Sequence, residues 1–297
     1  MSDVDPSEVP GLGTLELKVR ELMEGRHLGI HQSPHRGASV EFAEHRPYQP
    51  GDDIRNLDWS LFARTDRLYI KRYEKYTELS GDIFVDASDS MGFGEKWSTA
   101  QLLAGAMAYL LSAQGDQPEL HALTSDVKQV PSSRNRNQHR RVIRVLEETD
   151  PEGNRRLSPY LSRWLHENRE PSLLVLCSDF ISEDPEVLND LMDQAHGRGH
   201  DVVTIHIVSR EELELPGEGP VRFTDPESGE TIDTDVDGVR QEYRNQFQSF
   251  LDRIKSLFIR RGMGYLRVVA EENPAHQFGD FIRRRNRQIQ RTTGTGS

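Results

Sequence analysis

The sequence predicts an α/β protein built on a doubly wound, mostly parallel β-sheet, preceded by a loop-rich subdomain that contains β-structure. From residue 81 onwards, short apolar runs alternate with stretches of helical periodicity. The run at 172–177 is a continuous apolar strand, as expected when helices cover both faces, and the run at 201–208 predicts another buried strand. The uncharged stretch 97–115 contains several Ser, Thr and Gln residues and follows a strand, so we expect a buried helix rather than a membrane span.

The part of the chain after residue 80 divides into regular elements in a clear order. Strands are expected at 82–85, 118–123, 127–130, 172–177, 201–208 and 264–269. Helices are expected at 96–113, 139–148, 158–167, 185–196, 239–261 and 275–287. Ser158 and Asp184 are suited to cap the helices that follow them. The polar segment 221–235 has the character of a hairpin inserted between the last sheet elements.

The first 80 residues follow a different pattern. Apolar positions at helical spacing predict a helix at 15–28, whereas 29–66 is rich in Gly, Pro, Asp and Arg and shows little periodicity. Residues 67–73 alternate as an edge strand does. The predicted organisation is as follows: a flexible leader at 1–14, a helix with a Gly-Asp-Asp subdomain at 15–80, an α/β domain at 81–287 with a hairpin insertion near 215–236, and a flexible tail at 288–297.

Composition limits the classes of function. The chain has 297 residues with 37 Lys+Arg and 49 Asp+Glu, a formal net charge of −12, which argues against general affinity for nucleic acid. The single cysteine, Cys177, excludes an internal disulfide and a cysteine-rich zinc site. The acidic beginning of the chain lacks the pattern of a secretory signal. We therefore expect a cytoplasmic protein without a membrane span.

Polar residues follow two of the predicted buried strands. Asp86, Ser88 and Ser90 come directly after the first strand of the α/β domain, and Asp179 follows the strand at 172–177. Ligands of doubly wound sheets bind at the carboxyl ends of the strands, and hard oxygen donors suit Mg²⁺. The alternative is that Asp86 caps the next helix and the serines close turns.

These residues resemble the metal-ion-dependent adhesion site of the von Willebrand factor A-like fold. The resemblance implies that Asp86, Ser88, Ser90 and Asp179 hold Mg²⁺. The adhesion site usually adds a threonine from a third loop, but the corresponding stretch carries Arg155 and Arg156. An arginine there would repel the metal ion and could replace it by pairing with Asp86 or Asp179.

The segment before the α/β domain alternates acids with arginines. Its candidate residues are Glu41, Arg46, Asp52, Asp53, Arg55, Asp58 and Arg64. They form either a network of ion pairs and turn caps that orders the subdomain or a surface on which a partner docks, and the two roles can coexist. With the loop at Asp86, this segment closely resembles the bacterial family called domain of unknown function fifty-eight. The resemblance covers about residues 15–285 and implies a von Willebrand factor A-like domain and a MoxR-type AAA+ ATPase as partner.

We therefore expect a non-enzymatic protein-interaction module or adaptor, whose complete or degenerate adhesion site binds a protein partner. The alternative is a Mg²⁺-dependent hydrolase in which Asp86 and Asp179 hold the metal ion and Glu41, Asp52 or Asp53 acts as base. No nucleophile or activating histidine has a position that favours this alternative.

Overall fold

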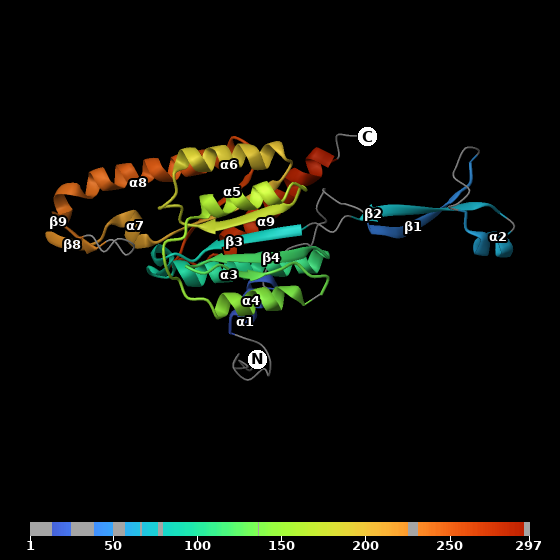
Figure 1. The fold of residues 1–297 in the computed structure, drawn as a ribbon, viewed down its shortest axis with the longest axis horizontal. Coiled ribbons are helices and arrows are strands. Elements are labelled where there is room, and N and C mark those ends of the chain that lie inside the picture. Colours follow the sequence, from blue (N-terminus) through green and yellow to red (C-terminus); the bar gives the residue numbers. More distant parts are fainter. Residues whose placement is uncertain are drawn as a thin grey trace. The chain divides into compact units, whose positions relative to one another are not determined.

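The computed structural model describes residues 14–24, 39–49, 57–65, 67–76, 80–135, 137–224 and 231–293. The chain divides into two units (Figure 1). The smaller unit is Ser33–Leu79, and the larger unit joins Met1–Gln32 to Ser80–Ser297. None of the helices among the described residues has the length and apolar character needed to cross a membrane.

The larger unit is built on a six-stranded sheet with the order β10-β7-β6-β3-β4-β5. The strands are β3 (Ser80–Asp86), β4 (Gln117–Leu123), β5 (Lys128–Val130), β6 (Leu173–Ser178), β7 (Asp201–Val208) and β10 (Gly264–Val269). All neighbours are parallel except β4 and β5. Counted along the chain, this is the order 3-2-1-4-5-6 of a doubly wound sheet, whose switch point lies between β3 and β6. The predicted fold class is confirmed.

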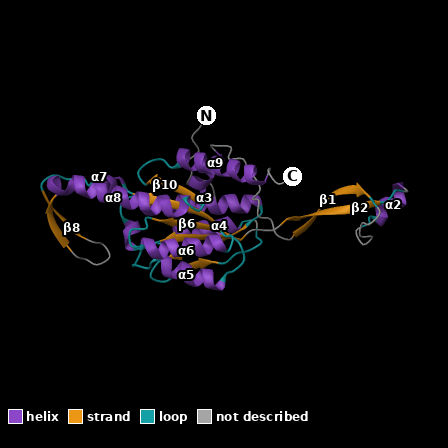
Figure 2. Cartoon of the chain, turned by 90° about the horizontal axis from the view of Figure 1, so that it is seen from above, coloured by secondary structure: helices purple, strands orange, loops and turns teal. Residues whose placement is uncertain are grey.

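Helices cover both faces of the sheet (Figure 2). One face carries α1 (Thr14–Glu24), α3 (Lys96–Gln114), α4 (Gln138–Glu147) and α9 (Ala275–Thr293). The other carries α5 (Leu157–Glu167), α6 (Pro185–Gly197) and α8 (Val236–Ile259). Successive residues of β3 point into opposite cores, with Ile83 and Val85 in one and Phe84 in the other. Burial on both faces explains why successive residues of β3 and β6 are apolar.

The two ends of the larger unit differ from the sequence-based division. Helix α1 was assigned to the N-terminal subdomain, but it packs against α3 and α4 because Leu15, Val19 and Leu22 form a buried apolar face. The Leu15 backbone N–H also donates to Glu147 Oε1 at 2.7 Å. At the other end, residues 288–293, predicted to be part of a flexible tail, continue α9.

The insertion before α8 contains more structure than predicted. The strands β8 (Pro220–Thr224) and β9 (Thr231–Asp235) pair antiparallel as the expected hairpin, and their connection lies outside the described residues. A short helix that the sequence analysis missed, α7 (Arg210–Glu214), precedes them. Ser209 begins this helix with a capping box, since its hydroxyl accepts from the Glu212 N–H and the Glu212 carboxylate accepts from the Ser209 N–H.

Where the structure describes it, the smaller unit consists of an antiparallel ribbon and a helix. The strand predicted at 67–73 overlaps β2 (Tyr69–Tyr76), which pairs with β1 (Ser39–Pro47). Strand β1 and helix α2 (Trp59–Thr65) lie in the stretch that was predicted to lack periodic structure. Asp58 Oδ1 accepts from the Leu61 N–H at 3.0 Å and so caps α2.

The remaining candidates of the smaller unit are placed as follows. Glu41 and Arg46 lie on β1, and Arg64 lies on α2. Asp52, Asp53 and Arg55 lie outside the described residues. The cap that Asp58 supplies to α2 is a contact of the kind expected to order this segment. The role of these residues in docking a partner stays a prediction.

Candidate functional site

The carboxyl ends of β3 and β6 bring the candidate residues of the larger unit to one rim. Asp86 is the last residue of β3, and Ser178 is the last residue of β6, directly before Asp179. Ser178 Oγ donates to Asp86 Oδ2 at 2.6 Å, so the two strand ends are in contact. The rim coincides with the switch point in strand order, where doubly wound sheets bind their ligands.

The loop after β3 gathers oxygen atoms in a small buried space. The hydroxyl oxygens of Ser88 and Ser90 lie 3.1 Å apart, and both residues are buried. Asp86 Oδ1 accepts from the Ser88 N–H at 3.0 Å and thereby closes the turn at the end of the strand. Asp86 thus closes a turn itself, and among the described residues neither the short 3₁₀ helix η3 (Asp89–Gly92) that follows nor α3 has a side-chain cap. The two serine hydroxyls are paired with each other.

Burial makes the charge of Asp86 unfavourable. Loss of hydration in the buried site, followed by repulsion from the nearby Asp179, raises the pKa of the Asp86 carboxyl to about 7. Hydrogen bonds from Ser178 and Ser88 oppose this shift in pKa without cancelling it. A cation bound beside Asp86 would favour the ionised carboxylate.

Asp179 has a cation of its own, which the sequence analysis missed. The Lys96 ammonium at the start of α3 donates to Asp179 Oδ2 at 2.8 Å and to Glu212 Oε1 at 2.5 Å. The Lys96 side chain is 1% exposed. Burial alone would lower the pKa of Lys96, but the two carboxylates outweigh burial and raise it. The ammonium is therefore charged, and it links α3, β6 and α7 at the rim.

The predicted arginine replacement of the metal ion is wrong for Arg155. Its guanidinium donates to the backbone carbonyls of Thr124 (2.9 Å) and Ser125 (2.5 Å), which follow β4. Arg156 is exposed and precedes α5. Arg155 lies there because the backbone carbonyl groups that follow β4 need hydrogen-bond donors. The cation beside Asp179 is Lys96 instead.

The loop in which the adhesion site usually has a threonine (residues 152–156, the third loop) nevertheless lies against the loop that carries Ser88 and Ser90 (residues 87–90, the serine loop). The Glu152 N–H donates to the Ala87 carbonyl at 2.8 Å, and the Asp89 N–H donates to the Gly153 carbonyl at 2.8 Å. The Gly153 N–H in turn donates to Asp89 Oδ1 at 3.0 Å. The stretch where a threonine ligand is usual thus contacts the loop of Asp86 through its backbone.

Comparison with known families decides where the chain belongs. The family model described as "Protein of unknown function DUF58" matches residues 44–253. The chain belongs to the DUF58 family. The match begins in β1 and ends within α8, so it includes the rim and every candidate residue of the acid-and-arginine segment except Glu41. Two uncharacterized proteins, Rv1480 of Mycobacterium tuberculosis and Mb1516 of Mycobacterium bovis, are each 30% identical to this DUF58 member over 244 residues, covering 78% of this chain and 75% of each relative.

Solved structures similar to this DUF58 member are distant from it in sequence. BatB from Bacteroides thetaiotaomicron is 15% identical, with a TM-score of 0.44, and the match covers 71% of this chain and 99% of BatB. An aerotolerance-related membrane protein from Bacteroides fragilis is 13% identical, with a TM-score of 0.46 and the same two coverages. The strand order of the sheet, rather than these likenesses, shows the doubly wound α/β fold.

Proposed function

We propose that this DUF58 protein is a non-enzymatic interaction module that binds a protein partner at the rim formed by Asp86, Ser88 and Ser90. The proposal depends on one observation. A buried carboxylate and two buried hydroxyl groups gather at the switch point of a doubly wound sheet. The rim contains acceptor oxygens and offers no activated nucleophile, so the arrangement suits binding rather than a reaction.

The donor atoms of this rim fit Mg²⁺. One carboxylate with two hydroxyl oxygens is a hard donor set, and Mg²⁺ keeps several water molecules when few protein ligands are offered. When bound, the ion supplies a coordination position that an Asp or Glu of the partner can occupy. Because Lys96 already neutralises Asp179, we assign direct binding of the ion to Asp86, Ser88 and Ser90. Asp179 is then held by Lys96 beside the ion and is not one of its direct ligands.

The partner we propose is a MoxR-type AAA+ ATPase. The support for this partner is the family resemblance. The chemistry of the rim adds a requirement, since the contacting segment of the ATPase must present an acidic side chain. The proposal does not identify the protein on which this chain and the ATPase would act together.

The test is the affinity of the full chain for a purified MoxR-type ATPase of the same organism, measured by surface plasmon resonance at constant Mg²⁺. We expect Asp86→Asn, and separately the double change Ser88→Ala with Ser90→Ala, to weaken binding by about tenfold or more, because each removes oxygen donors from the rim. Variants are compared at one Mg²⁺ concentration because an ATPase itself needs the ion to bind nucleotide.

Asp126→Asn is the matched control. Asp126 is an exposed carboxylate just beyond the end of β4, and its loss should leave the affinity unchanged. Binding that is equally tight in Asp86→Asn and in the serine variant would show that the ATPase docks elsewhere. A third outcome is that the rim variants weaken binding, whereas a chelator added in the absence of nucleotide does not. The partner would then bind at the rim without a metal ion.

A further inference from the structure

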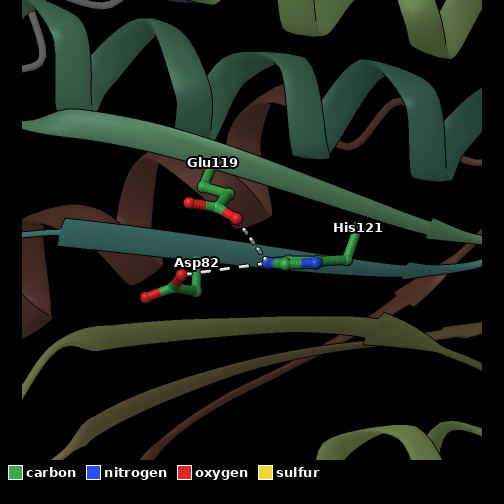
Figure 3. A group of neighbouring side chains, drawn as sticks. All are labelled: Asp82, Glu119 and His121. Atoms are coloured by element: carbon green, nitrogen blue, oxygen red, sulfur yellow. Dashed lines mark ion pairs between the residues drawn. The ribbon is translucent and has the colours of Figure 1, made fainter. Parts of the chain in front are cut away.

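A second group of side chains that can bind metal ions lies on the same sheet, towards the amino ends of β3 and β4. Asp82 and Glu119 are register partners on these neighbouring parallel strands, and His121 lies two residues further along β4. Side chains alternate along a strand, so this register places all three on one face. Figure 3 shows the two carboxylates converging on the edge of the His121 ring.

Each of the three side chains has two polar atoms. The outer atom, which faces away from the group, contacts a neighbouring residue, and the inner atom points to the centre of the group. Asp82 Oδ2 accepts from Ser80 Oγ at 3.3 Å, and Glu119 Oε2 accepts from the Ser132 N–H at 3.2 Å. His121 Nδ1 lies 3.0 Å from the Tyr160 hydroxyl. Metal-binding side chains in proteins are commonly oriented by such outer contacts.

The inner atoms have the spacing of ligands around one ion. His121 Nε2 lies 3.5 Å from Glu119 Oε1 and 3.8 Å from Asp82 Oδ1, and the three ligand atoms are all within 4.8 Å of one another. Two atoms that are each about 2.1 Å from a tetrahedral zinc ion are about 3.4 Å apart. An ion therefore fits among them with shifts of less than about 1 Å.

His121 Nε2 is the atom that points to a ligand. The residue is 2% exposed, its ring stacks on Phe84 with centroids 4.6 Å apart, and Nε2 has no hydrogen-bond partner among the described residues. A buried ring nitrogen without a partner is costly, and metal coordination is one of the few ways to satisfy it. The group also lines a pocket of about 620 Å³, which gives access and room for further ligands.

We propose that Asp82, Glu119 and His121 form a binding site for a divalent first-row transition-metal ion such as Zn²⁺. An imidazole with two carboxylates suits these ions better than Mg²⁺, which prefers oxygen donors alone. The two carboxylates also balance the charge of a divalent ion. This site is separate from the rim at Asp86, since Asp82 and Asp86 lie four residues apart on β3, about 13 Å at the rise of a strand.

The test uses the untagged full chain carrying Asp86→Asn, so that the rim does not contribute to metal binding. Isothermal titration calorimetry with ZnCl₂ should show one ion bound per chain. Glu119→Gln and Asp82→Asn should each weaken that affinity by about tenfold or more. Glu170→Gln is the matched control, because this exposed carboxylate lines the same pocket outside the group, and it should not change the affinity.

Mn²⁺ used as a spectroscopic probe gives a second readout. Pulsed electron paramagnetic resonance of the Mn²⁺-loaded protein should show coupling to one imidazole nitrogen, and His121→Gln should abolish this coupling. Circular dichroism of each variant confirms that the fold is retained. Zn²⁺ binding that is absent at about 1 mM, or that Glu119→Gln and Asp82→Asn leave unchanged, would overturn the proposal and reduce the group to an ion pair between His121 and the carboxylates.

Discussion

Replacing Lys96 with methionine is expected to lower the free energy of unfolding of the larger unit by about 3–5 kcal/mol. Methionine keeps much of the apolar volume of the lysine chain but removes the ammonium. Asp179, which is 1% exposed, then remains as a buried carboxylate without the cation that now lies 2.8 Å away. Denaturant unfolding followed by circular dichroism measures the change.

A double-mutant cycle separates the ion pair from the packing of Lys96. Lys96→Met combined with Asp179→Asn should be less destabilised than Lys96→Met alone, because the second change removes the uncompensated charge. Lys255→Met, on the exposed side of α8, is the matched control and should change the stability by no more than about 0.5 kcal/mol. Equal losses in the single and double variants would mean that Lys96 acts through packing.

Asp86→Asn is expected to stabilise the metal-free protein above neutral pH. The pKa of Asp86 is about 7 in the folded chain, against 3.8 for an aspartate in its ordinary, hydrated state. Between these values the folded state binds more protons than the unfolded state, so the stability of the wild type falls as the pH rises through this window. The loss is complete above about pH 7 and is on the order of 4 kcal/mol, and asparagine does not incur it.

The measurement is the difference in unfolding free energy between Asp86→Asn and wild type at several pH values in the presence of a chelator. Burial lowers the pKa of His206 to about 4, so His206 reduces stability as the pH falls from about 6.5. This contribution has the opposite sign, but it is present in both proteins and cancels in the difference. The difference should grow from about pH 4 to pH 7, and saturating Mg²⁺ should diminish it by stabilising the wild type. A difference that is constant with pH would show that Asp86 titrates normally.

The sheet could be predicted because each of its buried strands carries its own signal. In β6 and β7, burial on both faces favours apolar residues at successive positions, and such runs are visible in the sequence. The meeting of Asp86 with the end of β6 followed from the same logic, since neighbouring parallel strands end at one edge. Strand β1 gave no such signal because a register shift between Phe42 and Glu44 breaks the alternation that identifies a strand.

The partner of Asp179 could not be predicted from local patterns. Lys96 bonds to Glu212, which lies 116 positions later in the chain on a helix of five residues. Only the assembled fold brings them together. The group around His121 had a weaker signal that was available, since Glu119 and His121 alternate on β4 and Asp82 occupies the matching level of β3. Recognising it required the register between the two strands.

The backbone hydrogen bonds between the serine loop and the third loop affect how fast the proposed partner can associate. Ala87 and Asp89 are fixed to Glu152 and Gly153, and a side chain at position 153 would need a strained backbone and would crowd Ser125. The surface proposed to bind a partner is therefore pre-organised, so that docking would cost this protein little conformational entropy. Association should proceed in a single kinetic phase set by diffusion and orientation, and residence time should decide how tightly the partner is held.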